Sequence, residues 1–245
     1  MEIHVGCSGW FYSHWRGIFY PRQEVTTKNW FAYYANVFGT VELNAPFYRW
    51  PKPATVRRWS REAPPGFIYT VKVNQLITHE KRLLRTRQLV RDYYAIADTL
   101  QEKMGCFLFQ FPPSFKYSAV NLKRIVTQLD PARRSVVEFR HRSWWRENVF
   151  SALREHGITF CAVSAPRLPE EFPPNQPVAY FRLHGKSQWY RHNYTAAELQ
   201  IWQDRILASG AREAWIYFDN DRNAHAVKNA LQLRRALRAK GIQCS

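Results

Sequence analysis

Residues 178–184 read Val-Ala-Tyr-Phe-Arg-Leu-His, a short apolar run that ends in polar residues. Successive side chains of a β-strand point to opposite faces, so this run predicts a strand with Leu183 on one face and Arg182 and His184 on the other. Seven further runs of the same kind are predicted to be strands, at 3–7, 40–44, 68–74, 106–111, 135–140, 159–163 and 214–219.

Helix-like segments separate these strands. The clearest amphipathic stretches are 81–100, 196–207 and 224–239, where apolar residues recur at helical spacing. Eight strand-helix units in a chain of 245 residues favour a TIM-type (β/α)8 barrel, regular or irregular. An open doubly wound sheet is the alternative. We predict an α/β fold in which residues 1–245 form a single barrel domain.

Polar residues lie late in several of the predicted strands. In each case the apolar neighbours belong against helices, which turns the polar residues inward, toward the carboxyl-terminal mouth where barrel enzymes build their active sites. Strand 214–219 is ambiguous, because either Tyr217 and Asp219 or Phe218 and Asn220 can face inward. The inward residues of the other strands are Glu42, Asn44, Lys72, Gln110, Glu138, Arg140, Arg182 and His184.

The chemistry of these residue types suggests their roles. We predict catalytic roles in proton transfer or electrophilic catalysis for Glu42, Lys72, Glu138 and His184. Substrate-binding roles are predicted for Asn44, Tyr48, Gln110, Arg140, Arg182 and Asn220, in which the arginines clamp an anion and Tyr48 stacks on a ring. Three cations among these positions oppose a divalent ion, so no metal and no cofactor is expected.

Composition narrows the class of protein. The chain is 46% hydrophobic and 22% charged, with a mean hydropathy of -0.48, which excludes disordered and fibrous proteins and transmembrane segments. It begins without a secretory leader, and its four cysteines are scattered. We therefore expect free thiols, a cytoplasmic location and no membrane partner.

The charge is strongly positive. The chain carries 36 basic and 19 acidic residues, a formal net charge of +17 with a pI near 10.0. Such a basic protein attracts anions, either a small molecule or nucleic acid. A GC-rich genome, which favours arginine codons, would produce the same excess without any binding function. A dense basic helix face is expected at Lys81, Arg82, Arg85, Arg87 and Arg91.

Six separated segments together resemble one family. They are Gly6-Cys7-Ser8-Gly9-Trp10 with Phe19-Tyr20-Pro21, Val41-Glu42-Leu43-Asn44 with Phe47-Tyr48, Thr78-His79, Gln110-Phe111-Pro112-Pro113, Glu138-Phe139-Arg140-His141 with Ser143-Trp144, and Arg182-Leu183-His184-Gly185. This collinear set resembles the YecE-like family, a family of TIM-barrel proteins named for a domain of unknown function. The resemblance implies the barrel and no settled reaction.

The chain departs from the family pattern at three positions. Cys7 follows the first glycine, where the family usually has a small residue or threonine, and Ser164 ends a strand where it often has aspartate. Asp219 precedes Asn220, where the family more often has a second asparagine. Any role of a carboxylate at position 164 is therefore in doubt, and Asp219 is a candidate replacement.

Three functions remain open from the sequence. The leading hypothesis is an enzyme acting at the barrel mouth on an anionic substrate, either phosphorylated or derived from nucleic acid, with its reaction type undetermined. One alternative is a noncatalytic nucleic-acid-binding barrel that relies on its positive field. The other is a metal-dependent hydrolase of the endonuclease IV type, with ligands drawn from Glu42, His79, Glu138, His184 and Asp219.

Overall fold

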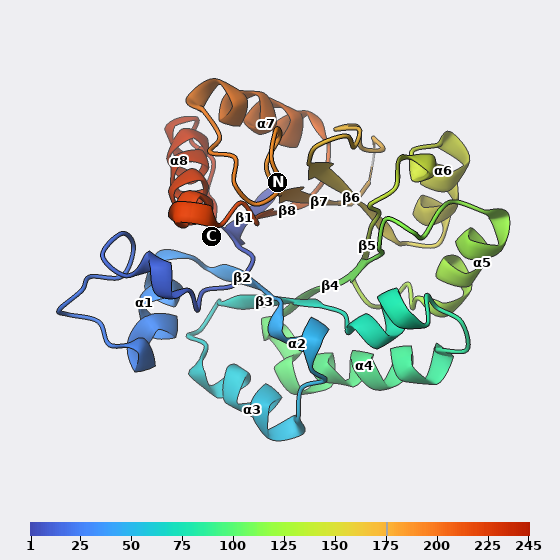
Figure 1. Ribbon diagram of the computed structural model, residues 1–245, viewed down its shortest axis with the longest axis horizontal. Coiled ribbons are helices and arrows are strands. Elements are labelled where there is room, and N and C mark those ends of the chain that lie inside the picture. The colour runs from blue at the N-terminus through green and yellow to red at the C-terminus, as the bar shows by residue number, and fades with distance from the viewer. Residues whose placement is uncertain (175) are drawn as a thin grey trace. The chain divides into compact units, whose positions relative to one another are not determined.

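The computed structural model describes residues 1–174 and 176–245 (Figure 1). Each predicted strand is confirmed, with ends that differ by at most two residues from the expected ones. The strands are β1 (Glu2–Cys7), β2 (Thr40–Leu43), β3 (Ile68–Lys72), β4 (Met104–Gln110), β5 (Ser135–Glu138), β6 (Thr159–Ser164), β7 (Val178–Leu183) and β8 (Glu213–Phe218).

Strand order identifies the fold class. The order in the sheet is β1-β8-β7-β6-β5-β4-β3-β2, and the pairings of β1 with β8, β3 with β4, β4 with β5, β5 with β6 and β7 with β8 are parallel. Strands follow one another in chain order, and the first strand pairs with the last, as in a barrel. The fold is an irregular (β/α)8 barrel of TIM type, as predicted.

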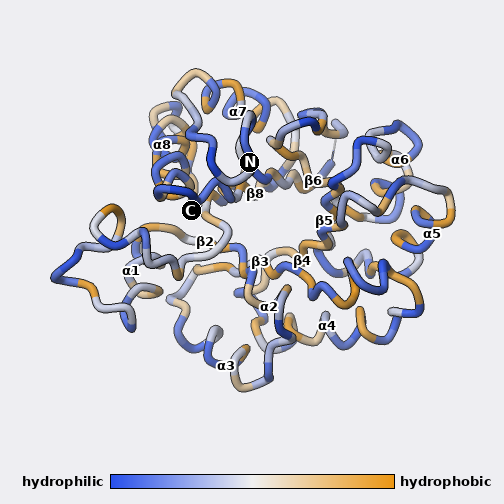
Figure 2. Tube along the Cα trace, in the orientation of Figure 1, coloured by the Kyte–Doolittle hydropathy of each residue, from blue (hydrophilic) through white to orange (hydrophobic). Residues whose placement is uncertain are grey.

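Eight α-helices accompany the strands in the described residues. They are α1 (Trp30–Val37), α2 (Ala45–Tyr48), α3 (Pro53–Glu62), α4 (Arg87–Leu100), α5 (Ala119–Gln128), α6 (Glu147–Glu155), α7 (Ala196–Ala208) and α8 (His225–Ala239). Figure 2 shows hydrophobic and hydrophilic residues alternating along helices such as α4, the pattern of a helix with one buried face. None of these helices is both long and apolar enough to cross a lipid bilayer.

The chain forms two compact units. Unit 1 consists of Met1–Glu42, Ala162–Glu170 and Pro174–Ser245. In it α8 packs against β1 and β8, with Val227, Leu233 and Leu237 buried. A capping box between Thr195 and Glu198 fixes the start of α7, because each side chain bonds the other's backbone N–H.

Unit 2 consists of Leu43–Cys161 and Glu171–Pro173. It contains β3, β4 and β5, with α3 packed on α4 and α5 on α6. The Ser118 hydroxyl caps α5 by accepting the Asn121 N–H. Beyond β5 the rings of Phe139 and Trp144 stack with centroids 4.0 Å apart. This packing fixes the chain that leaves the strand end, where polar residues follow.

The segment 81–86 differs from the prediction. The residues expected to begin a long helix instead follow a π-helix at Leu76–Glu80, and Arg82, Leu83 and Arg85 have positive φ angles of 49°, 58° and 55°. L-residues adopt this left-handed region as isolated residues and not as helices, so a right-handed helix cannot continue through residues 82–85. The predicted basic helix face is therefore wrong in part. Only Arg87 and Arg91 lie on α4.

Candidate functional site

Side chains of β2, β7 and β8 lie together within unit 1. The Tyr217 hydroxyl bonds Thr40 Oγ1 at 2.6 Å, and its ring lies 5.4 Å from that of Tyr180. Strand alternation then places Asp219 on the same face as Tyr217. This resolves the ambiguity of strand 214–219 in favour of Tyr217 and Asp219.

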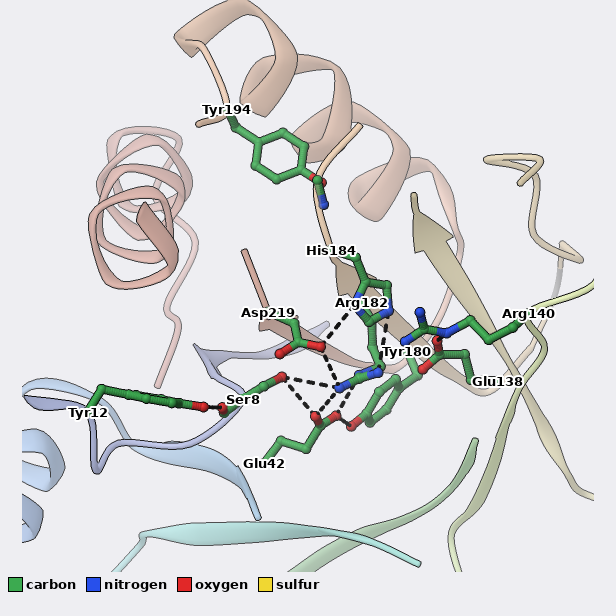
Figure 3. Close-up of polar contacts among 11 residues, drawn as sticks. Ser8, Tyr12, Glu42, Glu138, Arg140, Tyr180, Arg182, His184, Tyr194 and Asp219 are labelled. Atoms are coloured by element: carbon green, nitrogen blue, oxygen red, sulfur yellow. Dashed lines mark hydrogen bonds and ion pairs between the residues drawn. The ribbon is translucent and has the colours of Figure 1, made fainter. Parts of the chain in front are cut away.

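At the carboxyl ends of these strands lies the group that we call the Arg182 cluster. It consists of Ser8, Glu42, Tyr180, Arg182, His184 and Asp219 (Figure 3). All of its members belong to unit 1.

Glu42 and Arg182 form a fully buried ion pair at the centre of this cluster. Arg182 Nη2 donates to Glu42 Oε1 at 2.6 Å, and Nε donates to Oε2 at 3.0 Å, so the pair is bidentate. Both side chains have 0% exposure. The carboxylate also accepts the Ser8 hydroxyl at 2.8 Å and the Tyr180 hydroxyl at 2.6 Å. Four donors fix the Glu42 carboxylate, which is how proteins compensate a buried charge.

His184 connects this ion pair to Asp219. His184 Nδ1 lies 3.0 Å from Asp219 Oδ2, and its Nε2 lies 3.3 Å from Arg182 Nη1. Because a guanidinium can only donate, Nε2 accepts and Nδ1–H donates to the aspartate, which defines a neutral imidazole. Asp219 has a side-chain exposure of 17%, against 0% for Arg182 and His184. Asp219 is thus the carboxylate through which this network reaches solvent.

A second carboxylate, Asp221, follows two residues later. Its Oδ1 accepts the Trp15 indole N–H at 2.6 Å, and its Oδ2 lies 2.8 Å from His14 Nε2. Burial raises the pKa of Asp221 to about 6, and the negative charge of Asp219 contributes to this rise. Burial and these two carboxylates also raise the pKa of the nearby Tyr12 phenol. Unit 1 therefore holds one carboxyl group that titrates close to neutrality.

A cavity of about 460 Å³ lies beside His184, in the loops after β6 and β7. Its lining includes Arg167, Trp189 and Arg191. The Trp189 ring lies 5.3 Å from the His184 ring, so one residue of the cavity lining contacts the Arg182 cluster. Gly185 allows the turn between them, because its φ is 116° and a side chain there would collide with the Gln188 carbonyl.

Asn220, which was predicted to bind substrate, makes different contacts. Its Nδ2 donates to the His192 carbonyl and to Asn229 Oδ1 of α8, both at 2.8 Å, and it is fully buried. Its neighbour Phe218 is buried too, on the same face of β8. These contacts anchor the end of β8 to α8, and the predicted role in substrate binding stays a prediction.

Unit 2 contains a second group, which we call the His79 cluster. Its members are Lys72, His79, Gln110, Glu138 and Arg140. Arg140 Nε donates to Glu138, whose side chain is fully buried (Figure 3).

Packing and charge act together on His79. Gln110 Nε2 lies 3.5 Å from its Nε2, and the Phe47 ring stands edge-on to it at 4.9 Å. Lys72 Nζ lies 4.1 Å from the centre of the same Phe47 ring. Burial and then the charges of Lys72 and Arg140 lower the pKa of His79 to about 4. His79 is therefore a neutral imidazole at physiological pH.

The remaining predicted residues lie at the two ends of α2 in unit 2, with Asn44 just before the helix and Tyr48 as its last residue. Asn44 is half-buried, and Tyr48 is 71% exposed with its ring against Phe47. The strand-parity prediction brought Glu42, Arg182 and His184 together correctly. That residues of the Arg182 and His79 clusters line one cavity stays a prediction, as do the roles of Lys72 and Glu138.

Two residues of the site in unit 1, Tyr180 and Asp221, were missed by sequence reasoning. Tyr180 was overlooked although it shares the parity of Arg182 and His184, a signal that was present. Asp221 lies beyond β8, where strand parity no longer applies. His79, which the sequence offered within a family motif and as a metal ligand in one alternative function, lies in the π-helix Leu76–Glu80, a rare element that often marks functional sites.

Comparison with known proteins assigns the family. A model of the family described as "Protein of unknown function DUF72" matches residues 4–244. The chain belongs to the DUF72 family. The resemblance expected from the strand-end motifs is thereby confirmed.

Two similar proteins come from Bacillus subtilis and Escherichia coli. The UPF0759 protein YunF of Bacillus subtilis (strain 168) is 25% identical over 267 residues, which cover 94% of this chain and 93% of YunF. The UPF0759 protein YecE of Escherichia coli (strain K12) is 27% identical over 113 residues, covering 46% of this chain and 39% of YecE.

Solved structures share the fold. The DUF72 family protein TM1631 of Thermotoga maritima is 30% identical, with a TM-score of 0.85 over 97% of this chain and 100% of TM1631. The DUF72 family protein EF0366 of Enterococcus faecalis V583 is 20% identical, with a TM-score of 0.80 over 96% of this chain and 95% of EF0366.

Proposed function

We propose that this DUF72 protein is an enzyme that acts on an anionic substrate, phosphorylated or derived from nucleic acid, with the His184–Asp219 pair transferring a proton. The observation that carries the proposal is the cavity beside His184. Arg167 and Arg191 line it and supply two guanidinium groups, which suit a phosphate group. Trp189 lines it as well and offers an apolar face for a sugar or a base.

Backbone conformation supports a functional role for this cavity. Arg167 has a φ angle of 66° and Tyr190, next to Trp189, a φ angle of 62°. Left-handed conformations of such residues cost about 1–2 kcal/mol each and are found preferentially at functional sites. The Tyr190 N–H donates to the His184 carbonyl at 2.7 Å, so the strained loop is tied to the histidine that orients Asp219.

The carboxylates in and beside the Arg182 cluster have distinct roles in this proposal. Asp219 is the base, because its carboxylate reaches solvent and is oriented by His184 and Arg182. Glu42 is a positioning residue. Its carboxylate already accepts four hydrogen bonds, so its role is to hold Arg182 in place and not to exchange protons with a substrate. Asp221, with a pKa of about 6, supplies a carboxyl group close by that titrates near this pH.

Two measurements on matched variants test the proposal. Binding of pyrophosphate, sugar phosphates and nucleotides is measured by calorimetry, and turnover of any ligand that binds is followed by mass spectrometry. We expect Arg191→Gln and Arg167→Gln to weaken binding about tenfold each, since a charge-assisted hydrogen bond contributes about 1.5–3 kcal/mol. Arg154→Gln, an exposed arginine on α6, is the matched control and leaves binding unchanged.

Asp219→Asn separates catalysis from binding. We expect this variant to retain ligand affinity within a few-fold and to lose turnover by about a hundredfold or more, the usual contribution of general acid–base catalysis. Turnover that survives in Asp219→Asn would contradict the assigned role. Binding restricted to oligonucleotides, unaffected by Arg191→Gln and without turnover, would favour the noncatalytic nucleic-acid-binding alternative.

A further inference from the structure

We propose that Glu2, His4 and Glu213 form a binding site for a divalent transition-metal ion, with Zn²⁺ as the ion whose chemistry fits best. The three residues lie at the amino-terminal ends of β1 and β8, the opposite ends of these strands from the Arg182 cluster. Their ligand atoms all lie within 4.8 Å of one another. The site is independent of the proposed function.

Strand pairing places two negative charges side by side. Glu2 is the direct partner of Glu213 in the parallel register of β1 and β8, and His4 lies on the same face two residues along. Like charges directly opposite each other destabilise a sheet. A cation bound between the carboxylates would convert this repulsion into attraction.

The distances fit a metal ion. His4 Nε2 lies 3.4 Å from Glu2 Oε1 and 3.6 Å from Glu213 Oε1. Bonds of about 2.1 Å to Zn²⁺ at tetrahedral angles separate neighbouring ligand atoms by about 3.4 Å. Both separations that involve His4 thus match those between the ligands of a bound ion, and the third is at most 4.8 Å.

The histidine is oriented as a metal ligand would be. Its side chain is only 2% exposed, and Nε2 has no hydrogen-bond partner although it points between the two carboxylates. Its other nitrogen, Nδ1, lies 2.7 Å from Ser245 Oγ, and the ring stacks on Trp215 at 3.9 Å. When Nδ1–H donates to the hydroxyl, the lone pair of Nε2 is directed at the site, the arrangement typical of metal-bound histidines.

The donor set also indicates which ions would bind. One imidazole nitrogen with two carboxylate oxygens favours Zn²⁺ and neighbouring transition metals over Mg²⁺ and Ca²⁺, which prefer oxygen alone. The Glu2 side chain is 69% exposed, so water can complete the coordination. The ion would tie β1 to β8 and, through Ser245, to the segment that pairs with Ile3 and Val5. We therefore infer a stabilising site.

Untagged protein stripped with a chelator is titrated with Zn²⁺ by calorimetry and with Co²⁺ by visible absorption. We expect one equivalent of Zn²⁺ to bind and Co²⁺ to give the d–d bands of a low-coordinate nitrogen–oxygen site. Glu2→Gln, Glu213→Gln and His4→Phe should each weaken Zn²⁺ binding more than tenfold. Ser245→Ala should weaken it about tenfold through loss of ligand orientation.

The matched control is His192→Gln. His192 also contacts a glutamate, Glu198, at 3.0 Å, but both of its ring nitrogens have partners. We expect wild-type affinity from this variant. Glu2→Gln keeps the test decisive if His4→Phe does not fold, because the Glu2 side chain is exposed. The proposal is overturned if Zn²⁺ does not bind stoichiometrically, or if Glu2→Gln and Glu213→Gln bind it as tightly as His192→Gln.

Discussion

The Arg182 cluster in unit 1 and the His79 cluster in unit 2 both combine carboxylate, cationic and histidine side chains. They differ in which sign of charge is in excess. In the first, Glu42 and Asp219 share Arg182, so carboxylates outnumber cations. In the second, Lys72 and Arg140 act on His79 together with one carboxylate, so cations are in excess.

This difference decides how each unit responds to protons. In unit 1 burial and the negative charge of Asp219 raise the pKa of Asp221, whereas in unit 2 burial and positive charge lower the pKa of His79. In both cases the uncharged form is favoured. Asp221, beside the Arg182 cluster, and His79 are therefore expected to shift stability in opposite directions with pH.

The largest expected effect comes from removing the cation of the buried pair. Arg182→Met leaves Glu42 buried without its bidentate partner, and breaking such a pair costs about 3–5 kcal/mol of unfolding free energy. Urea denaturation measures the change. The matched pair is Arg205 with Glu170, which lie 2.7 Å apart but are 36% and 25% exposed. Arg205→Met should cost about 1 kcal/mol or less.

A double variant sharpens this comparison. When Glu42→Met is added to Arg182→Met, no unpaired charge remains buried, so part of the lost stability should return. Two results would show that burial does not determine how much the pair stabilises the protein. One is an equal loss of unfolding free energy in Arg182→Met and Arg205→Met. The other is strictly additive losses of unfolding free energy in the double variant.

Much of this comparison was accessible from the sequence, because strand parity depends only on local alternation. Strand parity correctly placed Glu42, Arg182 and His184 on inward faces. The count of eight strand-helix units correctly predicted the barrel. The start of α4 was mispredicted, because apolar spacing in segment 81–86 is compatible with a helix while its backbone turns through left-handed conformations. Charge balance around Asp221 and His79 depends on contacts between distant segments, which no local pattern encodes.

The next largest effect is the pH dependence that arises from Asp221. Its pKa is about 6 in the folded protein against an ordinary value of 3.8, so the folded state binds a proton more tightly. The resulting stability is present below pH 4 and is lost as pH rises toward 6, by about 2–3 kcal/mol. In Asp221→Asn this loss should disappear.

Denaturation of both proteins between pH 4 and pH 7.5 measures the effect of Asp221. Asp98→Asn, which removes a carboxylate that is 65% exposed, is the control and should leave the pH profile as in the wild type. A profile of Asp221→Asn that parallels the wild type would contradict the raised pKa.

His79 should give a smaller effect of opposite sign. Its pKa is lowered from 6.5 to about 4, so the unfolded chain binds the proton more tightly and stability falls as pH drops from 6.5 to 4. Because the ring is partly exposed, we expect about 1–2 kcal/mol. His79→Gln removes this acid-induced loss. His156→Gln, at an exposed histidine, serves as the control, and equal acid sensitivity of the two variants would argue against the lowered pKa.

The smallest effect isolates the contribution of charge to the pKa of His79. Lys72→Met keeps the aliphatic contact with Phe47 and removes the positive charge, so burial remains and only the repulsion is relieved. We expect the pKa of His79 to rise from about 4 by about half a unit to one unit. An NMR titration, with the His79 resonance assigned by its loss in His79→Gln, measures the shift. Arg82→Gln is the matched control, because this arginine is exposed and has a weaker influence on His79 than Lys72 or Arg140. An equal shift in both variants would mean that net charge in general, rather than the cation held against Phe47, sets this pKa.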